Sequence, residues 1–177
     1  DLLGDNRAPY SPTYGISKIA QEGVARGLAR ALGLPTTIAR MNAAYGDNGG
    51  LPAILLGMIL AGQPIPVPVG RAPIASPIHD DDIFAHTPGL LAAAAVPATI
   101  SNWGGDEAVD VREMARYLGE LVGREARIVE SPDGMTQFCL DATRRRELAG
   151  PCRVGWREGM RRMVAARQPQ LYAAARN

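Results

Sequence analysis

The spacing of apolar residues changes from segment to segment along the chain, and each change predicts a new element. The first segment begins at Ser11 and Pro12, a favoured N-cap and a favoured first helical residue. It ends at Gly33, a favoured helix end. Apolar residues three to four apart predict a helix over 12–32 with one apolar face. That face comprises Ile16, Ala20, Val24, Leu28 and Ala31.

The next segments alternate between strand-like and helix-like patterns. Residues 35–40 are short and β-branched, as expected of a buried strand. Residues 41–50 form a glycine-rich loop at the carboxyl end of that strand, which is where open α/β sheets bind ligands. Residues 51–61 are strongly apolar, which predicts a buried helix. Residues 63–69 alternate proline with aliphatic side chains, which predicts an extended edge segment.

The second half of the chain continues this alternation. Three acidic residues after His79 favour a helix start through the helix dipole, and the helix is predicted over 81–95. The residues from Asp110 to Glu113 resemble a capping box that opens a helix over 110–122. The other predicted elements are strands at 98–102 and 126–129, turns at 103–106 and 132–134, and helices at 143–148 and 156–166. Strands alternating with helices predict an α/β fold.

The composition fits one soluble globular domain. The chain has 177 residues, of which 46% are hydrophobic and 21% charged. A net charge of +1 gives no reason to expect nucleic acid or a membrane surface as a partner, and the arginines of the last third fit a solvated helix face. No apolar run is long enough to span a bilayer. The chain begins at Asp1 in a polar stretch without methionine, which suggests a piece of a longer protein.

The cysteines and the acidic cluster give no metal-binding pattern. Cys139 and Cys152 lack metal-ligand spacing, which favours a reduced, cytoplasmic protein, with a single disulfide as the alternative. His79 followed by three aspartates could bind a metal, but the helix start explains the acids more simply. We therefore predict no metal site and keep His79 as a candidate pocket residue.

Tyr14 and Lys18 are the strongest candidates for chemistry. Residues four apart on a helix lie on one face, one turn apart. An ammonium group within about 4–6 Å of a phenol favours the phenolate, so that a tyrosine can transfer protons near neutral pH. The alternative is an amphipathic helix with a surface lysine. Lys18 is the only lysine among 19 basic residues, and lysine, unlike arginine, is a compact and tunable cation.

Five short motifs in order resemble the extended short-chain dehydrogenase/reductase family, the NAD(P)-dependent epimerases and dehydratases. Residues 12–18 resemble its P-x-Y-x-x-S-K helix start, and residues 40–46 its R-x-x-N-x-Y-G loop. Residues 78–82 resemble its segment that ends in two acids. Residues 102–105 resemble its N-x-G-G turn, followed at 111–113 by the next helix. The resemblance covers nearly the whole chain, matched to the second half of such a protein.

The resemblance implies a fold and a set of roles. The fold would be the second half of a Rossmann-like parallel sheet plus a small C-terminal α/β substrate-binding part. Tyr14 would transfer a proton, and Lys18 would tune it and bind the nicotinamide ribose of NAD or NADP. Met41 and Asn42 would lie beside the nicotinamide, while Tyr45 and His79 would contact a small-molecule substrate. The Gly-rich phosphate loop and the catalytic serine or threonine belong to the family's first half.

The same resemblance implies a division of the chain. Residues 1–62 would complete the dinucleotide-binding domain, and residues 63–177 would mostly bind substrate, with 76–102 returning to the Rossmann-like sheet. Family members commonly dimerise through the tyrosine helix. The small residues Ala20 and Gly23 permit a homodimer there, and equally permit packing within the chain.

Two departures from the family pattern bear on the substrate. The family's loop asparagine falls on Ala43, with Asn42 one place early. The arginine that nucleotide-sugar members use on a phosphate falls on Ala75. Losing a charge-assisted contact removes roughly 1.5–3 kcal/mol, which favours a small carbonyl or alcohol as substrate. The alternatives are a nucleotide-sugar epimerase or dehydratase with a rearranged phosphate site, and a non-catalytic dinucleotide sensor.

Overall fold

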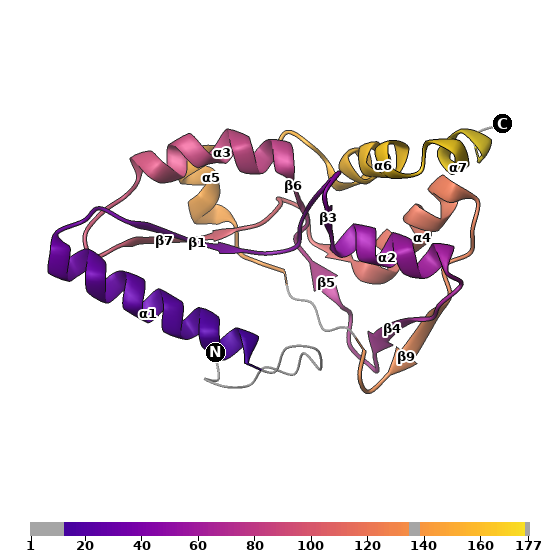
Figure 1. Cartoon of the computed structure of the whole chain (residues 1–177), viewed down its shortest axis with the longest axis horizontal. Coiled ribbons are helices and arrows are strands. Elements are labelled where there is room, and N and C mark those ends of the chain that lie inside the picture. The colour runs from indigo at the N-terminus through magenta and orange to yellow at the C-terminus, as the bar shows by residue number, and fades with distance from the viewer. Residues whose placement is uncertain (1–12, 135–138, 176–177) are drawn as a thin grey trace.

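The computed structural model describes residues 13–134 and 139–175, which form an elongated α/β structure with two groups of elements (Figure 1). The first group is α1 (Tyr14–Leu32), β1 (Thr37–Met41), α3 (Asp80–Ala92), β7 (Thr99–Trp103) and α5 (Thr143–Ala149). The second group is α2 (Leu51–Leu60), β4 (Ile65–Pro68), α4 (Val111–Val122), β9 (Ile128–Ser131), α6 (Trp156–Arg167) and α7 (Pro169–Ala174). The remaining short strands are β2 (Ala44–Gly46), β3 (Gly49–Gly50), β5 (Ile74–Ala75), β6 (Ile78–His79) and β8 (Val109–Asp110).

A parallel strand pair, β1 with β7, forms the centre of the first group. Its register runs from Thr37 opposite Thr99 to Met41 opposite Trp103. α3 packs on this pair, and the Thr37 hydroxyl donates a hydrogen bond to Leu90 O at 2.7 Å. The prediction of a buried first strand is wrong, because the side chains of β1 are half-buried or exposed. Parallel strands are buried when neighbours cover them on all sides, and among the described residues β1 pairs with β7 alone.

The helix α1 ends where the sequence predicts and exposes the apolar face that the sequence predicts. Gly33 adopts the left-handed conformation at φ 62°, which closes the helix. The predicted start at Ser11 and Pro12 lies outside the described residues, and Thr13, also expected to cap the helix, makes no side-chain cap hydrogen bond. Val24 is 60% exposed and Leu28 54% exposed. The apolar face of α1 is therefore uncovered.

Most of the other predicted helices are confirmed. The helices predicted over 51–61, 143–148 and 156–166 correspond to α2, α5 and α6, and the edge segment over 63–69 contains β4. In α4 the Asp110 carboxylate accepts a hydrogen bond from Arg112 N at 2.8 Å, as an N-cap does. Glu113 pairs with Arg157 at 2.5 Å, so its side chain is held by α6.

Three local structures differ from the predictions because more distant contacts decide them. The 41–50 segment contains two antiparallel strands, β2 and β3, around a turn at 47–48. α3 stops short of the predicted end at 95, because Ala95 turns back and bridges Thr36. The short helix α7 was not predicted and begins at Pro169, where proline suits a first helical position.

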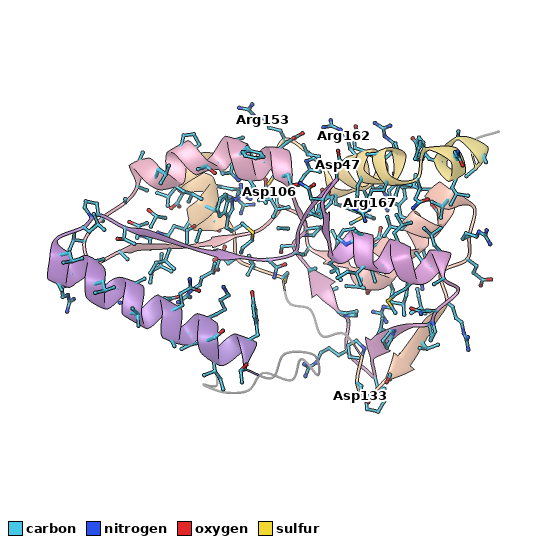
Figure 2. The ribbon with its side chains drawn as sticks, viewed as in Figure 1. Asp47, Asp106, Asp133, Arg153, Arg162 and Arg167 are labelled. Carbon is cyan, nitrogen blue, oxygen red and sulfur yellow. The ribbon has the colours of Figure 1, made fainter. Side chains whose placement is uncertain are left out.

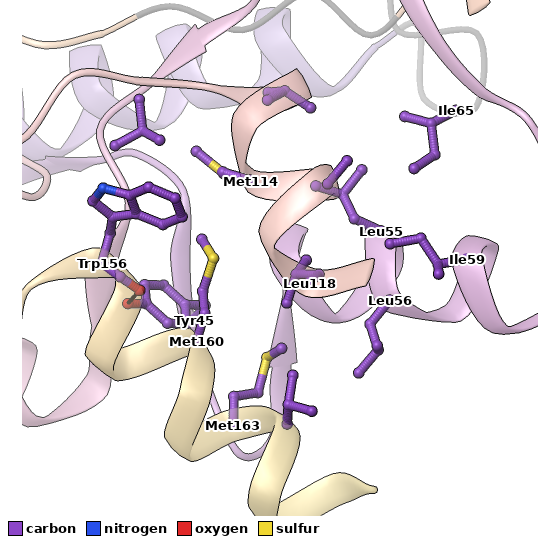
Figure 3. Close-up of a cluster of buried hydrophobic side chains, with 14 of the residues drawn as sticks. Tyr45, Leu55, Leu56, Ile59, Ile65, Met114, Leu118, Trp156, Met160 and Met163 are labelled. Atoms are coloured by element: carbon purple, nitrogen blue, oxygen red, sulfur yellow. Dashed lines mark hydrogen bonds between the residues drawn. The ribbon is translucent and has the colours of Figure 1, made fainter. Parts of the chain in front are cut away.

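The hydrophobic core lies in the second group, between α2, α4 and α6 (Figure 3). Leu55 of α2 and Met114, Leu118 and Met160 of the other two helices are fully buried. The predicted core face of α4 is confirmed at nearly every position. No helix within the described parts of the chain is both long and apolar enough to cross a membrane.

The α6 helix is also tied to the short β2–β3 hairpin. Figure 2 shows Arg162 and Arg167 of α6 beside Asp47 of the hairpin turn. Arg167 donates a hydrogen bond to Asp47 O at 2.7 Å, and Arg162 pairs with Asp81 at 3.2 Å. These contacts hold the last third of the chain against the 41–50 segment.

Candidate functional site

Tyr14 and Lys18 lie together on the first turns of α1. The Lys18 ammonium nitrogen is 5.4 Å from the centroid of the Tyr14 ring. Lys18 also donates a hydrogen bond to Gln21 Oε1 at 3.2 Å. The Tyr14 side chain is 58% exposed, so its hydroxyl is open to a ligand from outside. The pair therefore has the one-face geometry that its spacing predicts, on an accessible surface.

An ion pair fixes α1 against β1 close to this surface. Arg40 donates to both carboxylate oxygens of Glu22, at 2.9 and 2.7 Å. The hydrogen bond from Arg40 lowers the pKa of Glu22, although partial burial opposes that shift. Glu22 lies one helical turn after Lys18, and Arg40 directly precedes Met41. The ion pair therefore places the Lys18 face of α1 on the same side as the end of β1.

Sequence analysis assigned no role to Glu22. The signal was available, because Glu22 repeats the four-residue spacing from Tyr14 to Lys18 and so shares their helix face. Its partner lies far along the chain, and the helix alone could not identify it.

Met41 and Asn42 lie where β1 ends. Met41 is 49% exposed, whereas Asn42 is fixed between neighbouring segments. Asn42 N donates to Trp103 O at 3.0 Å, and Asn42 Oδ1 accepts from Ser76 N at 3.0 Å. In Figure 1 the N-terminal end of α1 and the carboxyl end of β1 face the same way, toward the middle of the molecule. Tyr14, Lys18, Met41 and Asn42 thus belong to one side of the first group.

Tyr45 and His79 are packed inside the molecule. They lie opposite each other in the parallel pairing of β2 with β6, with their rings edge to face at a centroid distance of 5.4 Å. Tyr45 is 2% exposed and its hydroxyl donates to Trp156 O at 3.2 Å. Burial raises the pKa of the Tyr45 hydroxyl, and the charge of Asp82 adds to that rise. A substrate-binding role for either residue stays a prediction.

His79 has two different nitrogens. Its Nδ1 accepts a hydrogen bond from Asp81 N at 3.1 Å and so caps α3, which begins at Asp80, beside the predicted start. Its buried Nε2 has no hydrogen-bond partner among the described residues. α6 covers this ring closely: a Cβ added at Gly159 would lie 2.9 Å from His79 Cδ2. A ligand could reach Nε2 only if α6 moved.

A shallow hollow of about 220 Å³ lies at the β2–β3 hairpin. It is lined by Ala44, Tyr45, Gly46, Asn48, Gly49, Gly50 and Asp80. Neither Tyr14 nor Lys18 lines it, so the open tyrosine–lysine surface and this hollow are separate features.

Comparison with known proteins yields matches in structure alone. No family model matches the sequence, and no curated protein sequence matches it. A UDP-glucose 4-epimerase from Thermotoga maritima, solved with UDP-glucose, is 25% identical with a TM-score of 0.69 over 90% of this chain and 54% of the epimerase. A dTDP-glucose 4,6-dehydratase from Streptomyces venezuelae, solved with NAD, is 24% identical with a TM-score of 0.73 over 90% of this chain and 51% of the dehydratase.

A third similar structure extends the set to another sugar. A UDP-glucuronic acid 4-epimerase from Bacillus cereus, solved with UDP-glucuronic acid and NAD, is 18% identical with a TM-score of 0.73 over 89% of this chain and 53% of the epimerase. The chain thus has the Rossmann-like α/β fold of these epimerases and dehydratases and spans about half of their length. The predicted fold class is confirmed.

Proposed function

We propose that this chain is the second half of an NAD(P)-dependent enzyme of the epimerase and dehydratase type. The observation that carries the proposal is the Tyr14–Lys18 pair, with 5.4 Å between ammonium and ring. It stands on an exposed helix face beside the end of a parallel strand, in a fold shared with enzymes solved with NAD. An accessible surface of this kind fits a nicotinamide cofactor, because the cofactor needs open residues at the ends of parallel strands.

In this proposal each residue has a role at a stated atom. The Tyr14 hydroxyl moves a proton to or from the substrate oxygen, and the Lys18 ammonium tunes the tyrosine and holds the nicotinamide ribose. Met41 and Asn42 border the nicotinamide. The Arg40–Glu22 ion pair sets the distance between these residues by fixing α1 against β1. NAD or NADP, when bound, would supply the hydride acceptor. The division of the chain at residue 62 remains part of this proposal.

For the substrate, the comparisons favour a nucleotide sugar over the small carbonyl or alcohol that the sequence suggested. The similar enzymes are solved with UDP-glucose and UDP-glucuronic acid. Ala75, which stands where the family's phosphate-binding arginine would be, is fully buried in β5 against β8. A nucleotide sugar would therefore take its phosphate contact from another residue. This rearranged site is the reading we adopt.

A homodimer or the family's first half is the proposed cover for the apolar face of α1. Val24 and Leu28 each leave more than half of the side chain exposed, at 60% and 54%. At roughly 25 cal/mol per Å² of apolar surface removed from water, covering such side chains is favourable. Both partners are consistent with the exposed face.

Replacing Tyr14 by phenylalanine in the full-length protein tests the proposal. Turnover of UDP- and dTDP-sugars, and of small alcohols and aldehydes, is measured with NAD and with NADP. We expect Tyr14→Phe to lower kcat by about 10²–10⁴-fold with cofactor affinity retained, because a positioned proton-transfer group contributes that much. Tyr117→Phe, on α4, is the matched control and should keep wild-type turnover. A sensor would bind the dinucleotide and respond to it equally in both variants, which would contradict the proposal.

A further inference from the structure

Three different metal-ligating side chains meet where α3 approaches the connection between α5 and α6. Asp82 and His86 are four residues apart on α3 and share one helix face. Cys152 comes from the connection that follows α5. One ligand atom from each of the three lies within 4.8 Å of the other two. The sequence gave no sign of this cluster, because Cys152 is far along the chain from the helix.

Backbone hydrogen bonds hold the cluster in place. The Asp82 carboxylate accepts from Arg153 N at 2.7 Å and from Val154 N at 3.1 Å. Cys152 N donates to Asp106 Oδ2 at 2.7 Å. Figure 2 shows Arg153 at the outer edge of this connection and Asp106 on its inner side. The Cys152 position is therefore fixed by carboxylates on both sides, which is how ligands of a built site are oriented.

The charge of Asp82 points to a cation. Asp82 is 1% exposed, and its hydrogen-bond partners among the described residues are two neutral backbone N–H groups. A buried carboxylate is costly unless it is paired with a cation or coordinates a metal. Asp106 differs, because it pairs with the fully buried Arg145. The aspartate beside His86 and Cys152 is thus the one whose charge is not offset by a basic side chain in these contacts.

The histidine is held loosely enough to become a ligand. Trp103 Nε1 donates to His86 Nδ1, so the imidazole proton is on Nε2, which faces Pro151 O. Both contacts are long, at 3.4 Å. Weak hydrogen bonds of this length are given up at small cost. Ligation through either nitrogen would change the surroundings of the Trp103 indole.

We propose that Asp82, His86 and Cys152 form a binding site for zinc or a zinc-like divalent cation. Carboxylate oxygen, imidazole nitrogen and thiolate sulfur are the three ligand types that zinc prefers. One carboxylate and one thiolate neutralise the charge of a divalent cation. Three protein ligands leave a fourth tetrahedral position for water, on the side where Cys152 is half-buried. The bound metal joins α3 to the α5–α6 connection and stabilises the fold.

Cobalt titration of the full-length protein tests this site. The protein is first stripped with a chelator, and cobalt(II) is added while thiolate-to-cobalt charge-transfer absorption and Trp103 fluorescence are recorded. We expect one equivalent to produce the charge-transfer band in wild type and in Cys139→Ser, which removes the exposed cysteine. Cys152→Ser should lose the band and weaken cobalt binding by at least about 10–100-fold, the loss caused even by changes around a ligand.

Thermal unfolding gives a second readout. Zinc should raise the Tm of wild type and of Cys139→Ser, and raise it much less in Cys152→Ser. The wild-type spectrum alone is decisive if Cys152→Ser fails to fold. A wild-type titration without a charge-transfer band would overturn the site, and so would a band that survives in Cys152→Ser.

Discussion

At the scale of single residues, Tyr14 and Lys18 depend on each other and on a neighbouring ion pair. The tyrosine is open and the lysine lies over its ring, while Glu22 on the same face binds Arg40. The sequence predicted the pair from its spacing and from the single lysine. It could not predict the ion pair, because Arg40 lies on the next strand and only the folded chain brings it to α1.

Lys18→Arg tests whether the cation must be a compact ammonium. The variant keeps the positive charge but replaces a point charge by a wide planar group. We expect the KM for the dinucleotide to rise and kcat to fall, since the guanidinium cannot occupy the same position against both ribose and tyrosine. Steady-state kinetics of the full-length protein measure both. Arg26→Lys on the same helix is the control, and equal kinetics for the two variants would exclude the proposed role of Lys18.

At the scale of elements, local patterns predicted the helices well and the pairing poorly. The apolar spacing of Val111, Met114 and Leu118 identified the buried face of α4, because a helix face is defined by nearby residues. The β2–β3 hairpin was missed, because glycine-rich segments fit loops and strands alike. The end of α3 was missed because Ala95 pairs with Thr36, and that pairing outweighs the helix preference of alanine.

The cap of α4 gives a stability prediction with a defined pH dependence. Asp110→Ala should destabilise the protein by about 1 kcal/mol, as loss of an N-cap does. The Arg112 side chain, followed by its backbone N–H, lowers the pKa of Asp110, although partial burial opposes the shift. Because the folded pKa lies below the unfolded value of about 3.9, the charge contributes above that pH and is lost as pH falls through the folded pKa.

Denaturant unfolding at neutral and acidic pH checks this cap. Asp110→Asn is the matched variant, because asparagine caps helices without a titrating group. The difference between wild type and Asp110→Asn should shrink as the pH is lowered through the folded pKa. A difference that stays constant over this range would show that the carboxylate charge contributes nothing.

At the scale of the whole molecule, α6 closes over the residues of β2 and β6. Gly159 allows this approach, since a Cβ there would lie 2.1 Å from Tyr45 Oη. The sequence could not indicate it, because Gly159 and Tyr45 are far apart in the chain. Tyr45 and His79 consequently form part of the packing, although their positions beside the 41–50 segment had suggested a ligand pocket.

Gly159→Ala should therefore destabilise the protein by about 1–3 kcal/mol, the usual cost of overpacking. The Tyr45 hydroxyl is held by Trp156 O and cannot move aside without losing that hydrogen bond. Gly57→Ala on α2 is the control, because a Cβ there meets nothing within 4 Å. It should stabilise by up to about 1 kcal/mol through helix propensity. Equal unfolding midpoints for the two variants would mean that α6 does not pack as described.

The central claim is that the Tyr14–Lys18 pair carries out proton transfer coupled to hydride exchange with a nicotinamide. The most direct measurement mixes the NAD-loaded full-length protein with a nucleotide sugar in a single turnover and follows the nicotinamide absorbance. The account predicts a change in absorbance that is slowed about 10²–10⁴-fold in Tyr14→Phe with NAD still bound. Equal rates in wild type and Tyr14→Phe would contradict it.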